Sequence, residues 1–256
     1  MPDEELIRQC RESGLPKGLA ELVEQFISAN AALQQVHPPE LHYQLEFAER
    51  VLLRELIAPE KHDNHWWHTG LHIVSEAIAR EPALAKEHSA ALTALWEQLD
   101  QRLGPYEAVT LQEINAKSVT GICLLSELMQ YPQNTFVAPN AYSLAEALFS
   151  DVAWYRAVYV GKAPAGFLML EDDAEKQKYY LWRFMIAPPF QRRGIGAKAI
   201  SLLVDYVKSR PGAKELQVSY IDHKEGPGPF YRGLGFKETG EVDEDEVLMS
   251  MKLKAQ

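Results

Sequence analysis

The stretch QRRGIGA, residues 191–197, sets two arginines and two glycines at the expected start of a helix. Backbone N–H groups in the first turn of a helix have no intrahelical partner and carry partial positive charge. Gly194 and Gly196 would let a phosphate approach these groups, while Arg192 and Arg193 add fixed positive charge. The stretch predicts either a pyrophosphate site or a plain strand-to-helix turn. It matches neither the dinucleotide fingerprint GxGxxG nor the P-loop GxxxxGK[ST].

The run HDNHWWHTGLH, residues 62–72, holds four of the eight histidines. On a helix, His65, His68 and His72 fall on one face, and imidazoles at such spacing can share a metal ion. However, the run lacks the HExxH motif and a clear further ligand, and Trp67 belongs to the apolar face of the same helix. We therefore expect helix-surface or interface packing here and no metal cofactor, with a metal site as the alternative.

The elements that must hold these groups change in kind near residue 104. Up to that point apolar residues recur at steps of three and four, which is typical of amphipathic helices. Four such segments are separated by breaks that contain proline, so residues 1–104 are predicted to form an all-α helical bundle. The four apolar faces contain Leu19, Val23, Phe26 and Leu33; Leu45, Leu52 and Leu56; Trp67, Leu71, Val74 and Ile78; and Leu92, Leu95 and Leu99.

After the boundary segment LGPYEA, residues 103–108, aromatic and β-branched residues predict strands. Residues 107–256 are therefore expected to form a mixed α/β (α+β) domain in which a buried strand, 178–186, leads through prolines into the glycine turn. The expected strands are 106–111, 152–160, 163–170, 178–186, 214–221, 236–242 and 246–253, and the expected helices are 115–130, 194–209 and 229–234.

Charge and composition exclude several classes of protein. The net charge is −10, and residues 1–104 carry most of it, with 9 Lys and Arg against 17 Asp and Glu. Neither part has a basic excess, so nucleic-acid binding is not expected. No apolar run reaches the ~20 residues that span a bilayer, and the polar start MPDEELIRQC is not typical of a signal peptide. Two distant cysteines, Cys10 and Cys123, fit the reducing cytoplasm.

Two motifs in the second domain carry a family resemblance. The order is a strand, then PxxQRRGIG, an amphipathic helix, a strand and FYRGLGF at 230–236. This order resembles the GNAT superfamily of acetyl-CoA-dependent N-acetyltransferases over about residues 107–254. Four segments further resemble the spermine/spermidine (diamine) acetyltransferase group: TLQEINAKSV, FVAPNAYSLAEA, WRFMI and GPFYRGLGFKETGE. Residues 1–104 have no counterpart in the single-domain members.

The resemblance implies how acetyl-CoA, as co-substrate, would be held. Gln191 to Ala197, with Ile195 between the two glycines, would form the pyrophosphate loop. Family members splay the fourth strand from the fifth, and the pantetheine arm fills the gap. Met185 and Ile186 would then supply backbone contacts, with the Ile186 N–H donating to the thioester oxygen. Tyr231 would act as the general acid that protonates the departing thiolate.

The group that deprotonates the acceptor amine is not identified by the resemblance. Many relatives use a glutamate on the fourth strand, whereas this strand has Trp182 and Arg183. Glu171 lies in the charge run LEDDAEKQK, which is typical of a solvated hairpin, and Glu225 stands where many relatives carry asparagine. Asn134 and Asn140, near the loop that covers the acceptor in relatives, are candidate substrate contacts.

The sequence therefore predicts an enzyme that moves the acetyl group of acetyl-CoA to a primary amine, such as a polyamine or other small cationic amine. The alternatives are a peptide, protein or aminoglycoside acceptor, or a non-catalytic module that senses acyl-CoA. The helical domain could form a homodimer interface, wall the acceptor site or bind a regulator. Its acidity could also gather a cationic substrate.

Overall fold

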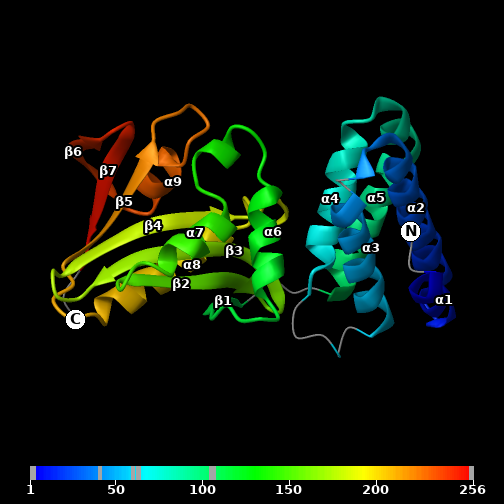
Figure 1. Cartoon of the computed structure of the whole chain (residues 1–256), viewed down its shortest axis with the longest axis horizontal. Helices are drawn as coiled ribbons and strands as arrows, with labels where there is room; N and C mark the ends of the chain where they lie inside the picture. The colour runs from blue at the N-terminus through cyan, green and yellow to red at the C-terminus, as the bar shows by residue number, and fades with distance from the viewer. Residues whose placement is uncertain (1–3, 40–41, 59–60, 62–64, 104–107, 254–256) are drawn as a thin grey trace. The chain divides into compact units, whose positions relative to one another are not determined.

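The computed structural model describes residues 4–39, 42–58, 61, 65–103 and 108–253. The chain divides into two compact units, a helical one and one built on a sheet, as Figure 1 shows. The predicted fold class, a helical region followed by a mixed sheet domain, is therefore confirmed. The predicted boundary near residues 104–107 lies outside the described residues, so its position stays a prediction.

The described part of the helical unit contains five helices rather than the four expected. They are α1 (Glu4–Glu12), α2 (Lys17–Val36), α3 (His42–Ile57), α4 (Trp67–Ala79) and α5 (Pro82–Leu103). Helix α2 contacts α3, α4 and α5, and α1 contacts α3. The apolar residues predicted from helical spacing form one buried cluster between these helices. Pro82 is the first residue of α5, a position where the missing N–H costs nothing.

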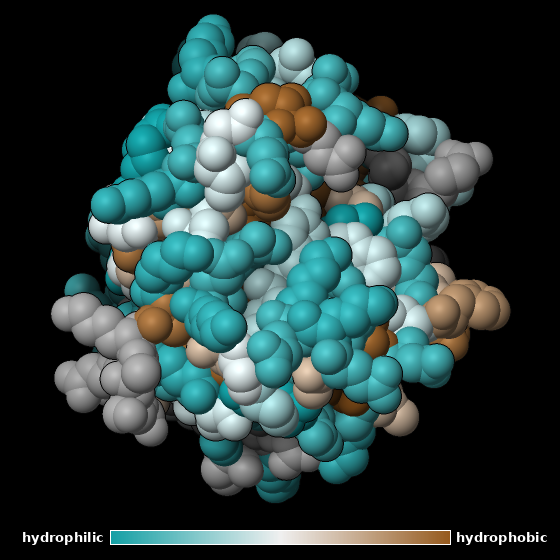
Figure 2. Space-filling view, turned by 90° about the vertical axis from the view of Figure 1, so that its left-hand side faces the viewer, coloured by the Kyte–Doolittle hydropathy of each residue, from teal (hydrophilic) through white to brown (hydrophobic). Residues whose placement is uncertain are grey.

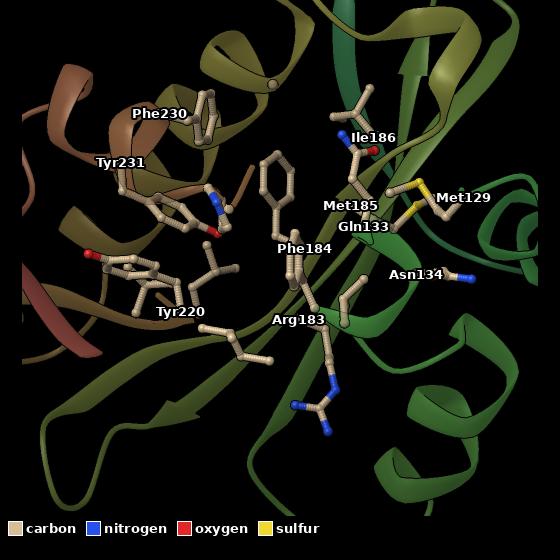
Figure 3. A pocket seen from close by; sticks show the side chains of 18 of the residues that line it. Met129, Gln133, Asn134, Arg183, Phe184, Met185, Ile186, Tyr220, Phe230 and Tyr231 are labelled. Carbon is tan, nitrogen blue, oxygen red and sulfur yellow. The ribbon is translucent and has the colours of Figure 1, made fainter. Parts of the chain in front are cut away.

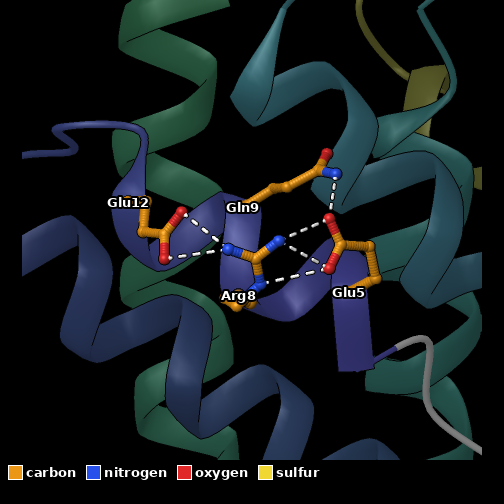
Figure 4. A network of polar contacts seen from close by, with 4 residues as sticks. All are labelled: Glu5, Arg8, Gln9 and Glu12. Carbon is orange, nitrogen blue, oxygen red and sulfur yellow. Dashed lines mark hydrogen bonds and ion pairs between the residues drawn. The ribbon is translucent and has the colours of Figure 1, made fainter.

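Helix α1 carries little of the apolar pattern, which is why the spacing did not reveal it. Only Leu6 and Cys10 are buried, one turn apart. On its exposed side Arg8 bonds Glu5 and Glu12, while Gln9 also donates to Glu5 (Figure 4). Exposed pairs of this kind contribute ~0.5 kcal/mol each at most, so the packing of Leu6 and Cys10 anchors this helix.

Some buried polar groups in the helical unit find partners inside it. The Asn30 side chain donates to the Leu45 carbonyl at 3.2 Å and to the Glu49 carboxylate at 2.8 Å. At the start of α4 no side chain of that segment caps the helix, and the Glu55 carboxylate from α3 accepts the Trp66 N–H instead. Such partners offset the cost of burying polar groups.

The histidine run does not form a metal centre in the described residues. No group of three or more His, Cys, Asp or Glu side chains in that part of the chain is arranged to hold an ion. His68 is buried and stacks on Trp67 with ring centroids 3.6 Å apart. Burial lowers the pKa of His72. The stacking of His68 fits the packing interpretation, while the metal alternative for His65, His68 and His72 stays untested.

The second unit is built on a seven-stranded sheet with strand order β1-β2-β3-β4-β5-β7-β6. The strands are β1 (Val109–Gln112), β2 (Ala153–Val160), β3 (Ala163–Asp173), β4 (Lys178–Ile186), β5 (Glu215–Ile221), β6 (Lys237–Asp243) and β7 (Glu246–Lys252). Strands β4 and β5 pair in parallel, whereas the β3–β4 and β5–β7 pairs on either side of them are antiparallel. All seven predicted strands are present.

Helices connect and cover these strands. They are α6 (Val119–Glu127), α7 (Asn140–Ala147), α8 (Ile195–Lys208) and α9 (Gly228–Gly233), with 3-10 turns at Gln133–Thr135 and Pro188–Phe190. Helix α8 contacts β1 and β4, and its Tyr206 stacks on Trp154 of β2 at 4.1 Å. The start of α8 lies beside the end of β4, since a Cβ on Gly196 would be 3.6 Å from Ile186 Cγ1. Helix α7 is an addition to the predicted elements, since its buried residues are the polar Asn140 and Ser143.

The surface of this unit on the side of β6 and β7 is mainly hydrophilic, with scattered apolar residues (Figure 2). Scattered single apolar residues are normal on a folded protein and require no partner. Among the described helices, none is both long and apolar enough to cross a bilayer.

Candidate active site

The sheet opens between β4 and β5. Among the described residues, the two strands pair at only two positions, Tyr180 with Gln217 and Leu181 with Val218. Each then continues on its other side, β4 along β3 to Ile186 and β5 along β7 to Ile221. The strands therefore diverge, and the inner edge of β4 beyond Leu181 is left without a β5 neighbour.

The direction of the β4 backbone follows from its pairing with β3. The Ala187 N–H donates to the Ala165 carbonyl at 2.8 Å, so Ala187 faces β3. Backbone groups alternate between the two edges of a strand, so Met185 also faces β3 and Ile186 faces the opening. Ile186 thus offers its N–H to the opening, whereas the backbone groups of Met185 belong to the sheet. A bulge in the β3–β4 register, at Trp182, bends β4 just where the strands part.

A cavity of about 850 Å³ occupies this opening. All of its wall residues lie between 129 and 246, and apart from Glu246 of β7 they fall into four groups. These are the loop from Met129 to Pro139, β4 with the turn that follows it, the end of β5, and α9 (Figure 3). The volume suits a substantial ligand, since small-molecule sites typically measure ~300–1,000 Å³.

The glycine turn forms one end of the cavity. Gly194 is the N-terminal cap of α8 with φ of +77°, a left-handed conformation that glycine adopts without strain. The first bond of the helix runs from the Lys198 N–H to the Gly194 carbonyl, so the N–H groups from Gly194 to Ala197 precede the helical pattern. A Cβ on Gly196 would lie 3.3 Å from the Phe230 ring. The turn therefore offers an anion both the space left by the missing side chain of Gly196 and the N–H groups that precede the helical pattern.

Gln191 has a supporting part in this turn. Its side-chain amide donates to the Ile186 carbonyl at 2.8 Å and to the Gln133 side chain at 3.0 Å. Gln191 therefore ties the turn before α8 to the end of β4 and to the loop at 133–135. Arg192 is exposed, lines the cavity and has φ of +58°, so the chain bends sharply beside the free N–H groups.

Tyr231 lies in the cavity wall opposite β4. Its side chain is only 5% exposed, and its ring packs edge-on against Phe230 and Phe236. In Figure 3 its hydroxyl points from α9 toward β4. Burial, and then the nearby Tyr180 and Glu246, raise the pKa of Tyr231 well above the ordinary value, so the phenol stays protonated. The hydroxyl can therefore donate a proton or a hydrogen bond into the cavity.

Residues 124–236 match the model of the acetyltransferase (GNAT) family. Residues 124–236 belong to a GNAT acetyltransferase domain. Proteins of this family are acetyl-CoA-dependent acyltransferases, and the protein is therefore an enzyme of that class. The match covers the loop at 129–139, β4, the glycine turn, β5 and α9, which together form most of the cavity wall. A comparison with curated protein sequences found no match.

Several solved structures are similar to part of the chain. An acetyltransferase from Thermus thermophilus is 16% identical, with a TM-score of 0.47, covering 58% of this chain and 99% of its own. The ribosomal-protein-S18-alanine N-acetyltransferase from Escherichia coli is 15% identical, with a TM-score of 0.45, covering 57% and 94%. A spermidine N-acetyltransferase from Vibrio cholerae, solved with CoA and spermine, is 15% identical, with a TM-score of 0.45. The similarity covers 57% of this chain and 96% of that one. These similarities leave the acceptor open.

The structure brings together most of the residues predicted for this GNAT site. Those in the cavity wall are Asn134, Met185, Ile186, Gln191, Arg192, Gly194, Gly196, Ala197 and Tyr231. Arg193 and Ile195 are not in the wall, and Ile195 is buried. Asn140 is fully buried and donates to the Ile122 carbonyl at 2.7 Å, so it holds α7 to α6 rather than facing the cavity. Glu171 is also elsewhere, paired with Lys178 at 2.8 Å.

Sequence reasoning missed a second set of polar groups in the wall of the GNAT cavity. Ser219 of β5 and Glu246 of β7 both line it, and the Ser219 hydroxyl donates to the Glu246 carboxylate. The Tyr180 hydroxyl is hydrogen-bonded to Ser219 in turn. The only local signal was the acidic run EVDEDE at 241–246, which by itself is typical of a solvated turn.

Proposed function

We propose that the protein transfers the acetyl group of acetyl-CoA to a primary amine by direct attack in a ternary complex. The observation that carries this proposal is the divergence of β4 and β5 beside the uncapped start of α8. It combines a backbone donor at Ile186, four N–H groups at the turn and the Tyr231 hydroxyl around one cavity. No covalent intermediate with the protein is required, because the amine itself is the nucleophile.

The glycine turn would bind the diphosphate of coenzyme A. The N–H groups from Gly194 to Ala197 lack helical acceptors, and Arg192 beside them adds positive charge. Gln191 would act indirectly, since its amide is used to hold the turn against Ile186 and Gln133. The Ile186 N–H, which faces the opening, would polarise the thioester carbonyl, and one such donor typically contributes ~3 kcal/mol.

Tyr231 would protonate the departing thiolate. Its raised pKa keeps the phenol protonated at neutral pH, so the proton is available at the moment the C–S bond breaks. The ring contacts with Phe230 and Phe236 hold the hydroxyl in one direction. These contacts support the proposed role of Tyr231 as general acid.

The acceptor is proposed to be a small cationic amine, such as a polyamine. Glu225 and Glu246 both line the cavity, and Glu246 is partly buried. Two arginines share this wall: Arg192 lies at the glycine turn, and Arg183 is paired with Glu146 at 3.1 Å, so the charge of Arg183 is balanced locally. A cavity whose acceptor side carries carboxylates favours a positively charged amine over an acidic substrate. A peptide or aminoglycoside amine remains the competing acceptor.

A binding experiment tests the cofactor site. In Gly196→Val the added side chain begins 3.3 Å from Phe230 and fills the space beside the N–H groups, so acetyl-CoA affinity should fall at least about tenfold. Calorimetry measures this, and Gly18→Val is the control because nothing lies within 4 Å of that position. Equal affinity in the wild type and Gly196→Val would rule out the turn as the anion site.

An activity experiment tests the transfer itself. Wild-type protein is incubated with acetyl-CoA and spermidine, cadaverine or glycylglycine, and the free thiol is followed over time. Thiol release with spermidine or cadaverine is expected. Tight acetyl-CoA binding without thiol release for any of the three would instead favour an acyl-CoA sensor.

A further inference from the structure

The acceptor amine needs a base that β4 does not provide. An alkylammonium with a pKa near that of lysine, about 10.4, is almost entirely protonated at neutral pH and cannot attack a thioester in that form. The described cavity wall contains two carboxylates, Glu225 and Glu246. Glu225 is exposed, lies in the loop before α9 and is 3.7 Å from Lys224. Glu246 is the better-placed group.

We propose that Glu246 is the general base that deprotonates the acceptor ammonium, with Ser219 and Tyr180 as the residues that orient its carboxylate. This inference rests on the proposed amine acetyl transfer and adds the missing proton acceptor to it. It places the base on β7, at the far wall of the opening, rather than on β4.

The sheet register brings Glu246 to the site. Glu246 is the first residue of β7 and pairs with Ile221, the last residue of β5. It therefore stands at the end of β5 that has parted from β4, where the cavity is. A carboxylate at this point faces the opening from the side opposite Ile186.

A chain of hydroxyls holds this carboxylate. Ser219 donates its proton to Glu246, so the hydrogen bond between Tyr180 and Ser219 has Tyr180 as its donor. One carboxylate oxygen is thereby fixed, and the other is left to meet the amine. Tyr180 is not in the cavity wall, so it supports Ser219 from behind. An oriented carboxylate of this kind is what proton abstraction requires.

The charges around Glu246 leave its negative charge available. No lysine, arginine or histidine in the described part of the chain forms an ion pair with it. The groups that face it are the neutral phenols of Tyr180 and Tyr231, whose pKa values are raised chiefly by burial. Arg183 and Lys178 lie near Tyr180, but each has its own carboxylate partner, Glu146 and Glu171. The acceptor ammonium would thus be the natural counter-ion.

The proton balance of the step is complete with these two residues. Glu246 takes one proton from the ammonium, which breaks an N–H bond and leaves the nitrogen lone pair free. A C–N bond then forms at the acetyl carbon as the C–S bond breaks, and Tyr231 gives its proton to the sulfur. The second proton lost by nitrogen restores Tyr231. Glu246 releases its proton to water, so the products are an amide, a thiol and one proton.

The test compares Glu246→Gln with the wild type on whichever amine of the panel the wild type acetylates fastest. We expect kcat at pH 7 to fall about 100-fold or more, since general bases typically contribute 10²–10⁴-fold. The variant's rate should also rise about tenfold per pH unit, because it depends on amine that is already neutral, whereas the wild type rises less steeply. Acetyl-CoA affinity by calorimetry should stay within about threefold.

Two further variants complete the design. Glu244→Gln makes the same change on an exposed residue of the β6–β7 turn outside the cavity wall, and it should keep kcat within about twofold. Ser219→Ala should lower kcat about tenfold with the carboxylate still present, and it tests the orienting chain even if Glu246→Gln folds poorly.

The outcomes separate the two proposals. If the wild type releases no thiol with any amine, the proposed function fails and this inference with it. If the wild type is active but Glu246→Gln keeps its kcat and its pH dependence, only the role of Glu246 is overturned. A raised KM with unchanged kcat would also overturn it, since that pattern indicates attraction of the cation without proton transfer.

Discussion

In the helical unit several buried polar groups bond within the fold, whereas in the acetyltransferase unit other polar groups line a cavity. In the helical unit Asn30 bonds Glu49 and the Leu45 carbonyl, and Glu55 serves the start of α4, so these groups are used by the fold itself. In the acetyltransferase unit Tyr231 and the Glu246 carboxylate face a cavity. The groups proposed for catalysis therefore lie where the regular pairing of the sheet stops.

The two units also differ in how their regular elements end. Helices α2 to α5 bury a continuous apolar stripe over their length. Strands β4 and β5 pair for only two residues and then part, although each remains paired on its outer side. A sheet can sustain such a break because the backbone groups on the outer edge of each strand still form hydrogen bonds, those of β4 with β3 and those of β5 with β7. Removing groups from the break should therefore affect turnover, and removing groups from the closed cores should affect stability.

The largest effect is expected from Tyr231→Phe. The change removes the proton donor but keeps the ring that packs on Phe230 and Phe236, so kcat should fall about 10³-fold, or ~4 kcal/mol, with acetyl-CoA affinity nearly unchanged. Steady-state kinetics and calorimetry measure the two quantities.

Tyr220→Phe is the matched control for this prediction. Tyr220 also lines the cavity, but its hydroxyl is bonded to Arg232 and Glu238. Its loss should change kcat less than about fivefold. Equal rates for Tyr231→Phe and the wild type would remove Tyr231 from the mechanism and leave it a packing residue.

A second prediction concerns Glu55 and the pH dependence of the helical unit. Burial raises the pKa of Glu55 to about 8, although the Trp66 and Trp67 N–H groups act in the other direction. Its ordinary pKa is about 4.3, so between pH 4.3 and 8 the folded state binds more protons than the unfolded state. The contribution of Glu55 to stability is thus present at low pH and lost as the pH rises through this window, on the order of 3 kcal/mol.

Chemical unfolding at pH 5 and pH 8 measures this loss. In Glu55→Gln the side chain cannot ionise, so that part of the pH dependence should disappear, while the repulsion among other acidic groups acts on both proteins. Glu24→Gln, an exposed change on α2, should behave like the wild type. Parallel pH profiles for Glu55→Gln and the wild type would show that Glu55 ionises normally in the folded protein.

The same difference between the units explains which elements could be predicted from the sequence. Spacing predicted α2 to α5 because their buried positions are apolar and recur with helical period. It missed α1, which buries only Leu6 and Cys10, and α7, whose buried residues are Asn140 and Ser143. Both are short helices with too few apolar positions to define a stripe.

The candidate site could be predicted only where it is local in sequence. The glycine turn and the segment around Tyr231 are continuous motifs, and the structure places both at the cavity. Ser219 and Glu246 meet through the β5–β7 register across 27 positions of the chain, and nothing within a short window indicates it. Asn140 is a residue that the sequence placed in the site although the structure does not. It is the first residue of α7, and its side chain is buried against the Ile122 carbonyl instead of lining the cavity.

The smallest effect comes from a matched pair of core changes. Ile78 of α4 and Ile200 of α8 are both buried, one in each unit, so Ile→Val should cost about 1 kcal/mol at either position. Saturating acetyl-CoA stabilises only the unit that binds it, by ~2.7 kcal/mol at 100 times Kd. In thermal unfolding, acetyl-CoA should therefore offset the loss in Ile200→Val and leave the loss in Ile78→Val uncorrected.

This comparison decides whether the two cores unfold independently. Each core is closed by its own residues, and all residues of the cavity wall lie between 129 and 246, so the ligand is expected to raise one transition and leave the other in place. If acetyl-CoA offsets both losses equally and a single transition is seen, the units unfold as one cooperative body. The helical unit would then contribute to the stability of the catalytic one even though none of its described residues lines the cavity.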